Sequence, residues 1–293
     1  MNPWLKKLLF DESILTRTAV HFIARPGPIA MLLLVRDEMD IIEQNINFHL
    51  RFGIEQFVVT DNGSVDGTRD ILADFERRLG KSFVIIDDAE PVYHQAQSVN
   101  RMIETAKDKF RPRWIISCDA DEFWYPVSGR YDTEIDGTRN ILQCYWRNLL
   151  PRADVPWQEF CDTGEMPGYH NRMCKLLCLA RGLAGMYVGN HESRSIPRIA
   201  ARSENIHVYH YPIRSYSQFE RKIVQGHRAA VKASFAGSAA WHWAEYYQAW
   251  ESGRLQQVYE EMASLNRIAE DDTMARFFRD GVKPMRSSRL PGN

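Results

Sequence analysis

The sequence predicts an α/β fold with a mostly parallel, Rossmann-like central sheet, helices on both faces of the sheet and further helices near the C-terminal end. Apolar runs of strand length alternate with segments of helical periodicity between residues 29 and 123. Such alternation is typical of a parallel sheet whose strands are joined by right-handed helical crossovers. With 293 residues, of which 44% are hydrophobic, the chain is long and apolar enough to build a substantial core.

The predicted elements follow one another closely along the chain. The apolar runs predicted as strands are 29–35, 57–60, 83–86 and 114–116, and the helices expected between them are 38–52, a helix around 71–75, and 95–110. Beyond Phe123, glycine and proline break the pattern, and shorter strands are expected at 144–146 and 175–179. Helical spacing returns from Ser217 and again over 241–259, before a tail that is expected to be frayed.

The charge and cysteine content argue against several classes of protein. Lys and Arg number 37 against 38 Asp and Glu, so net charge gives no general argument for binding nucleic acid. The five cysteines form no Cys-x-x-Cys pair, which argues against a disulfide framework or a structural zinc site and favours the reducing cytoplasm. Asp11 and Glu12 interrupt the apolar N-terminus, so neither a signal peptide nor a membrane-spanning helix is expected there. A short amphipathic contact with a membrane surface stays open, with a helix docked on the domain as the alternative.

The run 114–116 leads into an acidic cluster formed by Asp119, Asp121 and Glu122. In an open α/β sheet, ligands bind beyond the carboxyl ends of the strands, so these acids lie where a functional site is expected. Only Ala120 separates Asp119 from Asp121, and both side chains can reach a single Mg²⁺ or Mn²⁺ ion whose other ligands are phosphate and water oxygens. A solvated turn without function is the alternative for so short a motif.

Several motifs occur in order along the chain. They are 35–38 (Val-Arg-Asp-Glu), 61–68 (Asp-Asn-Gly-Ser-Val-Asp-Gly-Thr), 119–123 (Asp-Ala-Asp-Glu-Phe) and 210–215 (His-Tyr-Pro-Ile-Arg-Ser). Their order and composition across residues 29–227 resemble those of the family 2-like glycosyltransferases of the GT-A fold. The stretch 119–123 looks like the metal motif of this family, Asp-x-Asp, in the Asp-Glu-Phe form that one branch uses.

The resemblance implies a metal-dependent enzyme whose donor substrate is a nucleotide-diphosphate sugar. By this resemblance, the Asp61 carboxylate would accept a hydrogen bond from the nucleotide base, and the backbone around Arg36 would line the same pocket. Asp119 would face the ribose or the metal, and Asp121 would bind the Mn²⁺ or Mg²⁺ ion that bridges the two phosphates. His210 is the best match to the late histidine that completes the metal shell in many GT-A enzymes, and a buried structural histidine is the alternative.

The attacking hydroxyl of the acceptor needs a general base, which we expect on the acceptor side of the fold. Glu192 follows the apolar residues 186–188 in the region where this fold usually places its base, and we nominate it as catalytic. His191 is expected to orient Glu192 or to act as an alternative base. A surface carboxylate without function is the other interpretation of Glu192. The resemblance also implies direct displacement with inversion at the anomeric carbon.

The predicted function is the transfer of a sugar to a glycan or lipid-linked acceptor, in glycan or surface polysaccharide biosynthesis on the cytoplasmic side. Within one GT-A domain we expect a nucleotide-sugar-binding half (29–125) and an acceptor-side half (126–215). The flanking parts are an N-terminal segment (1–28) and a C-terminal helical extension with a tail (216–293).

Two other functions remain as alternatives. A nucleotidyltransferase acting on sugar phosphates shares the doubly wound sheet and a metal-binding acid. It would ordinarily have a glycine-rich loop after the first strand, and residues 35–38 contain no glycine. A catalytically silent carbohydrate-binding module would keep the fold without the chemistry, and the intact pair of Asp119 and Asp121 argues against it.

Overall fold

The computed structural model describes residues 23–88, 95–152, 154–161, 174–232, 241–265 and 271–280. The chain divides into two compact units, one of residues 1–147, 170–210 and 229–235, and one of residues 148–169, 211–228 and 236–293. Most of the predicted N-terminal segment and the whole predicted tail lie outside the described residues. The functional halves predicted from the sequence stay a prediction, because the two units are defined by compactness alone.

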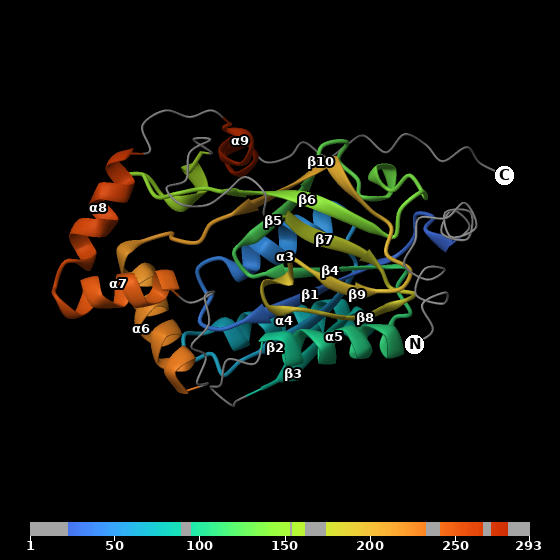
Figure 1. The fold of residues 1–293 in the computed structure, drawn as a ribbon, viewed down its shortest axis with the longest axis horizontal. Coiled ribbons are helices and arrows are strands. Elements are labelled where there is room, and N and C mark those ends of the chain that lie inside the picture. The colour runs from blue at the N-terminus through green and yellow to red at the C-terminus, as the bar shows by residue number, and fades with distance from the viewer. Residues whose placement is uncertain are drawn as a thin grey trace, which may run out of the picture. The chain divides into compact units, whose positions relative to one another are not determined.

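The first unit is built on an eight-stranded sheet in the order β3-β2-β1-β4-β7-β6-β10-β5 (Figure 1). The strands in chain order are β1 (Ile29–Val35), β2 (Gln56–Asp61), β3 (Phe83–Asp87), β4 (Trp114–Asp119), β5 (Glu122–Pro126), β6 (Ile141–Asn148), β7 (Cys174–Leu179) and β10 (Ala200–His210). The strands β3, β2, β1 and β4 run parallel. Beyond β4 the strands pair antiparallel, β7 with β4, β6 with β7 and β5 with β10. The predicted α/β fold is confirmed, and its parallel part is formed by the four strands at the N-terminal end of the chain.

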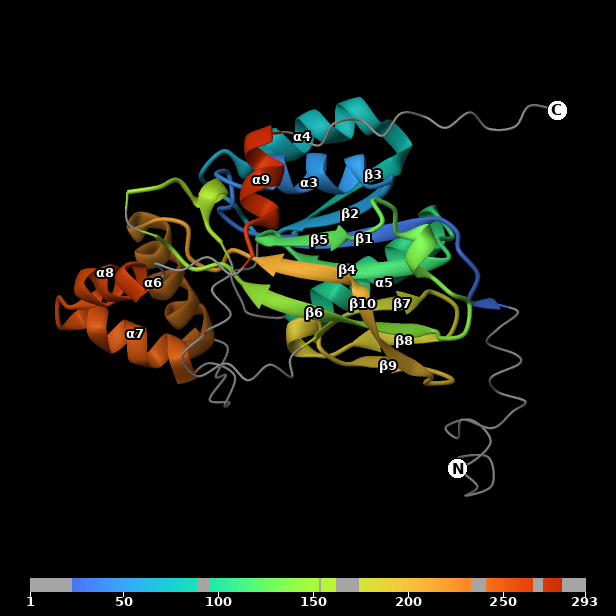
Figure 2. The ribbon, with the colours of Figure 1, turned by 90° about the horizontal axis from the view of Figure 1, so that it is seen from above.

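Three helices join the parallel strands in the predicted places. They are α3 (Ile42–Arg51), α4 (Thr68–Leu79) and α5 (Gln95–Lys109). Figure 2 shows α3 and α4 side by side along the strands. Because α5 connects β3 to β4 across β2 and β1, it returns in the opposite direction and covers the other face, as a right-handed crossover requires.

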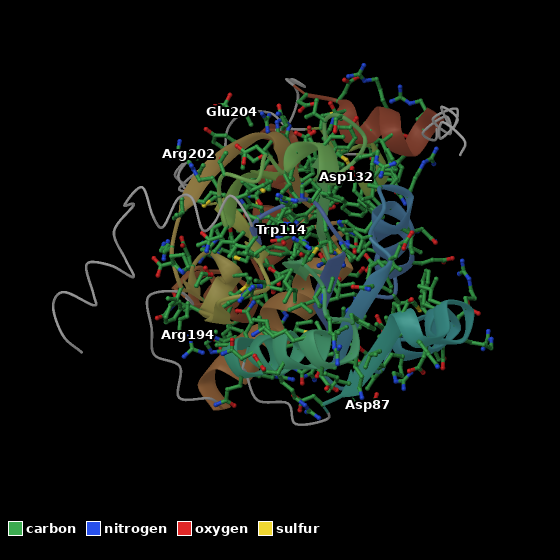
Figure 3. All side chains as sticks on the ribbon, turned by 90° about the vertical axis from the view of Figure 1, so that its right-hand side faces the viewer. Asp87, Trp114, Asp132, Arg194, Arg202 and Glu204 are labelled. Carbon is green, nitrogen blue, oxygen red and sulfur yellow. The ribbon has the colours of Figure 1, made fainter. Side chains whose placement is uncertain are left out.

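The core follows from the alternation of side chains along the strands. Ala30 and Leu32 of β1 point to the same face, where they pack with Val99, Met102 and Ile103 of α5. All five side chains are 1% exposed or less. Trp114 at the start of β4 is also fully buried, and Figure 3 shows it in the interior of the unit. Its indole nitrogen donates to the carbonyl of Arg25 at 3.0 Å, so the large ring is buried without an unpaired polar atom.

A small two-stranded sheet completes the first unit. It consists of β8 (Leu183–Met186) and β9 (Ser193–Ser195), which pair antiparallel. The turn between them, residues 187–192, carries both residues that the sequence analysis nominates as catalytic. The side chain of Asn100 on α5 accepts a hydrogen bond from the backbone of Met186 at 2.8 Å, so α5 fixes the start of this turn.

The helices in the described part of the second unit are most of α6 (Tyr216–Lys232), α7 (Trp241–Glu251), α8 (Leu255–Leu265) and α9 (Thr273–Asp280). A core of buried apolar residues joins α6 to α7 and α8, with Phe219, Ile223, Ala249 and Leu255 among its members. The helical stretch predicted over 241–259 is two helices, because the chain turns at Gly253, where φ is +71°. In the part of the chain that the structure describes, no helix has both the length and the apolar character to cross a membrane.

Candidate active site

The acidic cluster forms a tight turn between two strands that are not neighbours in the sheet. Strand β4 ends at Asp119, and β5 begins at Glu122 and leaves to pair with β10. Asp121 and Glu122 are buried, with 3% and 0% of their surface exposed. The side chain of Asp119 is 31% exposed. Buried carboxyl groups need hydrogen bonds or opposite charges, so the partners of this acidic turn define the site.

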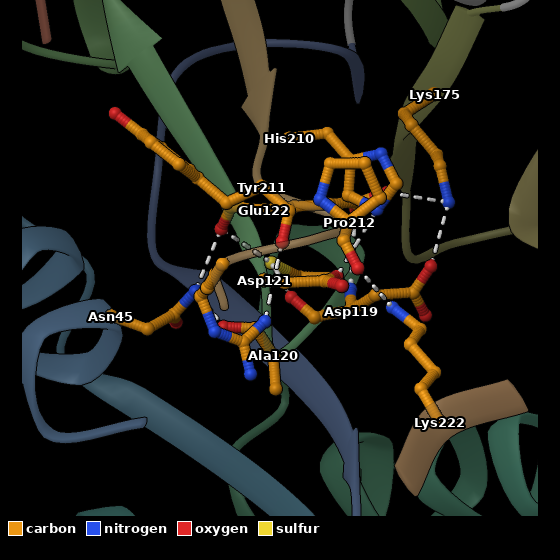
Figure 4. Close-up of polar contacts among 12 residues, drawn as sticks. Asn45, Asp119, Ala120, Asp121, Glu122, Lys175, His210, Tyr211, Pro212 and Lys222 are labelled. Atoms are coloured by element: carbon orange, nitrogen blue, oxygen red, sulfur yellow. Dashed lines mark hydrogen bonds and ion pairs between the residues drawn. The ribbon is translucent and has the colours of Figure 1, made fainter. Parts of the chain in front are cut away.

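Helix α3 holds the acidic turn through two buried polar side chains, Asn45 and His49, of which Figure 4 shows Asn45. The amide nitrogen of Asn45 donates to the carbonyl oxygens of Ala120 at 2.9 Å and of Glu122 at 2.7 Å. One helical turn later, His49 Nε2 accepts the backbone N–H of Trp124 at 3.1 Å. The proton of the neutral ring therefore lies on Nδ1, which donates to the carbonyl oxygen of Asn45 at 2.8 Å. The backbone on both sides of Asp121 is thus fixed from α3.

The His49 ring is neutral in the folded protein. Burial lowers its pKa to about 3, against a smaller opposing effect of the hydrogen bond to the Asn45 carbonyl. A charged ring would carry an N–H donor on both nitrogens and need two acceptors, but Nε2 faces a backbone N–H, which only donates. Asn45 and His49 therefore form a fixed polar pair in the apolar face of α3, and we refer to them as the α3 clamp.

Lys175 binds the acidic turn from the opposite side. It lies on β7, which runs antiparallel to β4, and its side chain is 2% exposed. Its Nζ atom is 2.9 Å from Asp119 Oδ2 and 2.7 Å from Glu122 Oε1. It also donates to the carbonyl oxygen of Gly189 at 3.1 Å. Figure 4 shows the Lys175 and Asp119 side chains directed toward each other.

The buried charges shift the protonation of these groups. Burial raises the pKa of Glu122 to about 8, although the charge of Lys175 acts in the opposite direction. Burial alone would lower the pKa of Lys175, but Asp119 and Glu122 outweigh it and raise that pKa above its ordinary value. Lys175 is therefore a permanently charged group, and Glu122 takes up a proton more readily than a surface glutamate does.

Asp121 has a different partner. Its Oδ1 atom lies 3.3 Å from Nε2 of His210, the last residue of β10, and both side chains are largely buried. The antiparallel pairing of β10 with β5 places His210 opposite Glu122 and so brings the ring to the acidic turn. The ring of Trp146 on β6 stacks on His210, with the ring centroids 4.7 Å apart. The turn between β4 and β5 thus meets residues of two strands that are distant in sequence, β6 and β10.

The pair of Asp121 and His210 fits part of a metal site. It offers a carboxylate oxygen and an imidazole nitrogen 3.3 Å apart, a separation at which both atoms can bind one ion. Among the described residues there is no group of three or more His, Cys, Asp or Glu side chains arranged to hold a metal. An ion of the Mg²⁺ or Mn²⁺ type often uses only one or two protein ligands and completes its shell with phosphate and water oxygens. Asp119 differs, because its Oδ2 atom is bound to Lys175.

The loops after β1 and β2 are joined to each other. In both loops, polar side chains accept hydrogen bonds from the backbone of the other loop: Asp37 N to Ser64 Oγ (3.0 Å), Glu38 N to Thr68 Oγ1 (2.9 Å), Met39 N to Asp66 Oδ2 (3.1 Å) and Val65 N to Asp37 Oδ1 (2.8 Å). These loops contain the residues that the resemblance assigns to the nucleotide base. They form a single surface at the carboxyl ends of the two strands.

Of the two predicted base-binding residues, Asp61 ends β2 and Arg36 begins the loop after β1. Asp61 is 4% exposed, and its Oδ1 atom accepts hydrogen bonds from the backbone and hydroxyl of Ser64 at 3.0 and 2.6 Å. One oxygen of the Asp61 carboxylate therefore stabilises the loop that follows β2. The Arg36 side chain is 34% exposed, and its Nε atom lies 3.9 Å from Asp37 Oδ2. Their contacts with a nucleotide stay predictions.

The two candidate bases differ in their surroundings. Glu192 is exposed, and its carbonyl oxygen accepts the backbone N–H of Tyr187. His191 is half-buried, and its Nδ1 atom lies 2.9 Å from the carbonyl oxygen of Cys174, so Nδ1 carries the proton and Nε2 is the nitrogen that can accept another. Its ring contacts Trp146 edge-on, with the centroids 5.7 Å apart. Burial lowers the pKa of His191, and the charge of Lys175 lowers it further, so the ring is neutral.

The sequence analysis did not identify Lys175, Asn45 or His49 as site residues. Each is a polar residue within an otherwise apolar pattern. This feature of the sequence could have identified them as candidate site residues. Lys175 is the single charged residue in the buried strand Cys174–Leu179, and a buried lysine requires acidic partners. Asn45 and His49 share the buried face of α3 with Ile42 and Ile46.

Comparison with known proteins matches part of the chain to a family model. Residues 40–128 match the family model described as Glycosyl transferase family 2. The matched residues include the α3 clamp, the loop 61–68 and the acidic turn, but they end before Lys175, His191 and His210. No curated protein matches the chain.

Several solved structures are similar at low sequence identity. Staphylococcus aureus TarS 1–349 is 13% identical with a TM-score of 0.44, over 68% of this chain and 65% of that chain. The same TarS fragment in complex with UDP-GlcNAc is 11% identical with a TM-score of 0.43, over 68% and 66% of the two chains. The mannosyltransferase PcManGT from Pyrobaculum calidifontis, in complex with GDP-Man and Mn²⁺, is 15% identical with a TM-score of 0.43, over 86% and 96%. The chain therefore spans slightly less than two thirds of the TarS fragment.

Proposed function

We propose that this chain transfers a sugar from a nucleotide-diphosphate sugar to an acceptor hydroxyl in a metal-dependent reaction, and the match of residues 40–128 to the family model described as Glycosyl transferase family 2 supports the proposal. The observation that carries the proposal is the contact of His210 with Asp121 of the acidic turn. Asn45 and Lys175 hold this turn from two sides. A buried carboxylate beside an imidazole, fixed at the carboxyl end of a parallel strand, is suited to an ion that also binds phosphate oxygens.

The residues have separate roles in this proposal. Asp121 and His210 would hold the Mn²⁺ or Mg²⁺ ion, which when bound neutralises charge on the diphosphate leaving group as a Lewis acid. Asp61 and the backbone near Arg36 would receive the nucleotide base, in the surface formed by the joined loops. Asp119 would be directed toward the ribose, since one of its oxygens already binds Lys175.

The base that takes the proton of the acceptor hydroxyl lies in the turn 187–192. Glu192 is our first candidate, and its exposure leaves it accessible to a large acceptor. His191 is the second candidate, because it is a neutral imidazole whose Nε2 atom can accept a proton. Either base would support direct displacement with inversion at the anomeric carbon.

The acceptor is proposed to be a glycan or a lipid-linked glycan, in the biosynthesis of a surface polysaccharide. All five cysteines are free in the structure, which supports a reducing compartment such as the cytoplasm. A peripheral contact with a membrane surface would bring the enzyme to a lipid-linked acceptor.

A thermal-shift screen tests the proposal. The protein is heated with UDP, GDP, ADP, CDP or dTDP, each with and without Mn²⁺, because a ligand at about 100 times its dissociation constant adds about 2.7 kcal/mol to the folded state. We expect stabilisation by one nucleotide that depends on Mn²⁺. If no nucleotide stabilises the protein in the presence of Mn²⁺, the glycosyltransferase proposal loses its main support and the silent binding module replaces it.

A second assay separates the enzyme alternatives. A glycosyltransferase releases a nucleoside diphosphate from UDP-glucose, UDP-GlcNAc or GDP-mannose, even if water is the acceptor. A nucleotidyltransferase instead forms a nucleoside triphosphate when pyrophosphate is added. Release of the diphosphate without any triphosphate supports the proposed function, and triphosphate formation contradicts it.

A further inference from the structure

Lys175 joins two parts of the chain that the proposed function needs to hold together. Its ammonium group has three N–H donors, and three oxygen atoms lie within hydrogen-bond distance of it: Asp119 Oδ2 at 2.9 Å, Glu122 Oε1 at 2.7 Å and the Gly189 carbonyl oxygen at 3.1 Å. Two of these acceptors belong to the acidic turn, and the third belongs to the turn 187–192. The side chain is 2% exposed, so these contacts are protected from water.

Within the turn 187–192, the positions of the two candidate bases depend on the position of Gly189. Gly189 has φ of +82°, and a Cβ atom at this residue would lie 2.8 Å from Cδ2 of His191, so the imidazole ring rests directly on Gly189. The N–H of Tyr187 donates to the carbonyl of Glu192 at 3.1 Å and closes the turn. A shift of the Gly189 carbonyl would therefore move both His191 and Glu192.

Among the described residues, one other side chain forms a hydrogen bond with Gly189. Its N–H donates to Oε1 of Gln95, at the start of α5, at 3.0 Å. Gln95 fixes the turn against α5, whereas Lys175 fixes it against the acidic turn. Of these two hydrogen bonds, the one from the Lys175 ammonium group connects the turn 187–192 to the acidic turn.

We propose that Lys175 is a positioning residue that sets the turn 187–192, and with it the general base, against the acidic turn that receives the donor. This inference rests on the proposed function for its catalytic consequence, but its structural part does not. A lysine that only neutralised Glu122 would be dispensable once that charge were removed. A lysine that positions the turn would remain necessary.

Two variants separate these roles. Lys175→Met leaves Glu122 buried without a positive charge and is expected to be strongly destabilised. Lys175→Met combined with Glu122→Gln removes both members of the ion pair, and Asp119 remains accessible to water at 31% exposure, so most of the thermal stability should return. Lys107→Met is the matched control, because Lys107 also donates to a backbone carbonyl, that of Leu183 at 2.6 Å, but does not reach Gly189.

The first measurement needs no ligand. In the double variant, hydrogen exchange of the backbone amides in 187–192 should be faster by about tenfold, since the opening of a local segment is governed by its own contacts. Exchange in the same peptide of the Lys107→Met control should match the wild type. Equal exchange in the double variant and the wild type, at similar melting temperatures, would overturn the inference.

The second measurement uses the release of diphosphate from UDP-glucose, UDP-GlcNAc and GDP-mannose. The double variant should lose about tenfold or more in turnover, because small displacements of a catalytic group are costly, while its affinity for the nucleotide stays within about threefold of the wild type. Full turnover in the double variant would show that Lys175 only neutralises charge and does not position the turn. If the wild type itself binds and cleaves no nucleotide sugar, the proposed function fails, and the hydrogen exchange result still decides the role of Lys175.

Discussion

The Nε2 atom of His210 lies 3.3 Å from Oδ1 of Asp121, although the two residues are far apart in the sequence. The contact exists because β5 leaves the acidic turn and pairs with β10, whose last residue is His210. The position of the acid is fixed by the α3 clamp, and the position of the ring is fixed by the register of β10 and the stack on Trp146. A carboxylate oxygen and an imidazole nitrogen are therefore held at a set distance by the fold itself.

Asp121→Asn is expected to abolish most of the Mn²⁺-dependent affinity for nucleotide while leaving the fold intact. The substitution keeps the size of the side chain and removes its charge, so the loss should be at least about tenfold, or 1.4 kcal/mol. Isothermal titration with the stabilising nucleotide, with and without Mn²⁺, measures it. Asp132→Asn is the control, because Asp132 pairs with Arg130 on the exposed surface. Unchanged affinity in Mn²⁺ would remove Asp121 from the metal site.

Glu192→Gln is expected to bind donor normally and to lose transfer by a factor on the order of 10² or more, as expected when a general base is removed. Donor affinity and turnover are measured separately, so that a binding defect is not mistaken for a catalytic one. His191→Gln provides the comparison, because it keeps a polar side chain of similar length without an imidazole. Near-normal turnover of Glu192→Gln together with a loss in His191→Gln would assign the base to His191.

Asn45→Leu is expected to destabilise the protein by about 2 to 4 kcal/mol. The carbonyl oxygens of Ala120 and Glu122 would lose their shared donor in a buried site, and each unsatisfied group costs about 1 to 3 kcal/mol. Urea unfolding of the variant and the wild type gives the difference. Asn47→Leu, at an exposed position of the same helix, should change stability by less than about 0.5 kcal/mol. Equal effects of the two substitutions would contradict the role of the α3 clamp.

The buried His49 predicts a specific dependence of stability on pH. Its folded-state pKa of about 3 is below the ordinary value of 6.5, so the unfolded chain binds the proton more readily between these values. The stability that His49 contributes is fully present above pH 6.5 and is lost as the pH falls toward 3. Between pH 7 and 5, the wild type should lose about 2 kcal/mol more than His49→Gln in its free energy of unfolding. Urea unfolding at the two pH values measures this difference, and equal losses would show that folding does not lower the pKa of His49.

Much of the fold was predictable because the elements of its parallel part have local sequence patterns, namely apolar runs and helical spacing. The apolar run 29–35 has the length of a buried strand and is followed at once by a segment of helical spacing, and the structure has β1 and α3 there. The helix predicted over 95–110 is α5, and its predicted buried stripe, with Val99 and Met102, packs in the core. The antiparallel strands beyond β4 are less predictable, since glycine and proline interrupt them and their pairing is decided by distant partners.

The site was predictable only where the chemistry lies in a short motif. Asp119 and Asp121 are conspicuous because acids follow an apolar strand. Lys175 could not be placed beside them without the register of β7 on β4, which pairs Ile116 with Leu177 and so carries the lysine toward the end of β4. The sequence also gave no indication that the two aspartates have different partners, one a lysine and one a histidine.

The hydrogen bonds between the loops after β1 and β2 have a consequence for the rate and cost of ligand binding. Because each loop orders the other, the surface proposed to receive the nucleotide base is held in place by the protein's own hydrogen bonds. A preorganised surface loses little conformational entropy on association, so more of the contact energy is retained as affinity. A substitution such as Ser64→Ala would then weaken binding through added disorder of the empty protein, even at a residue that touches no ligand.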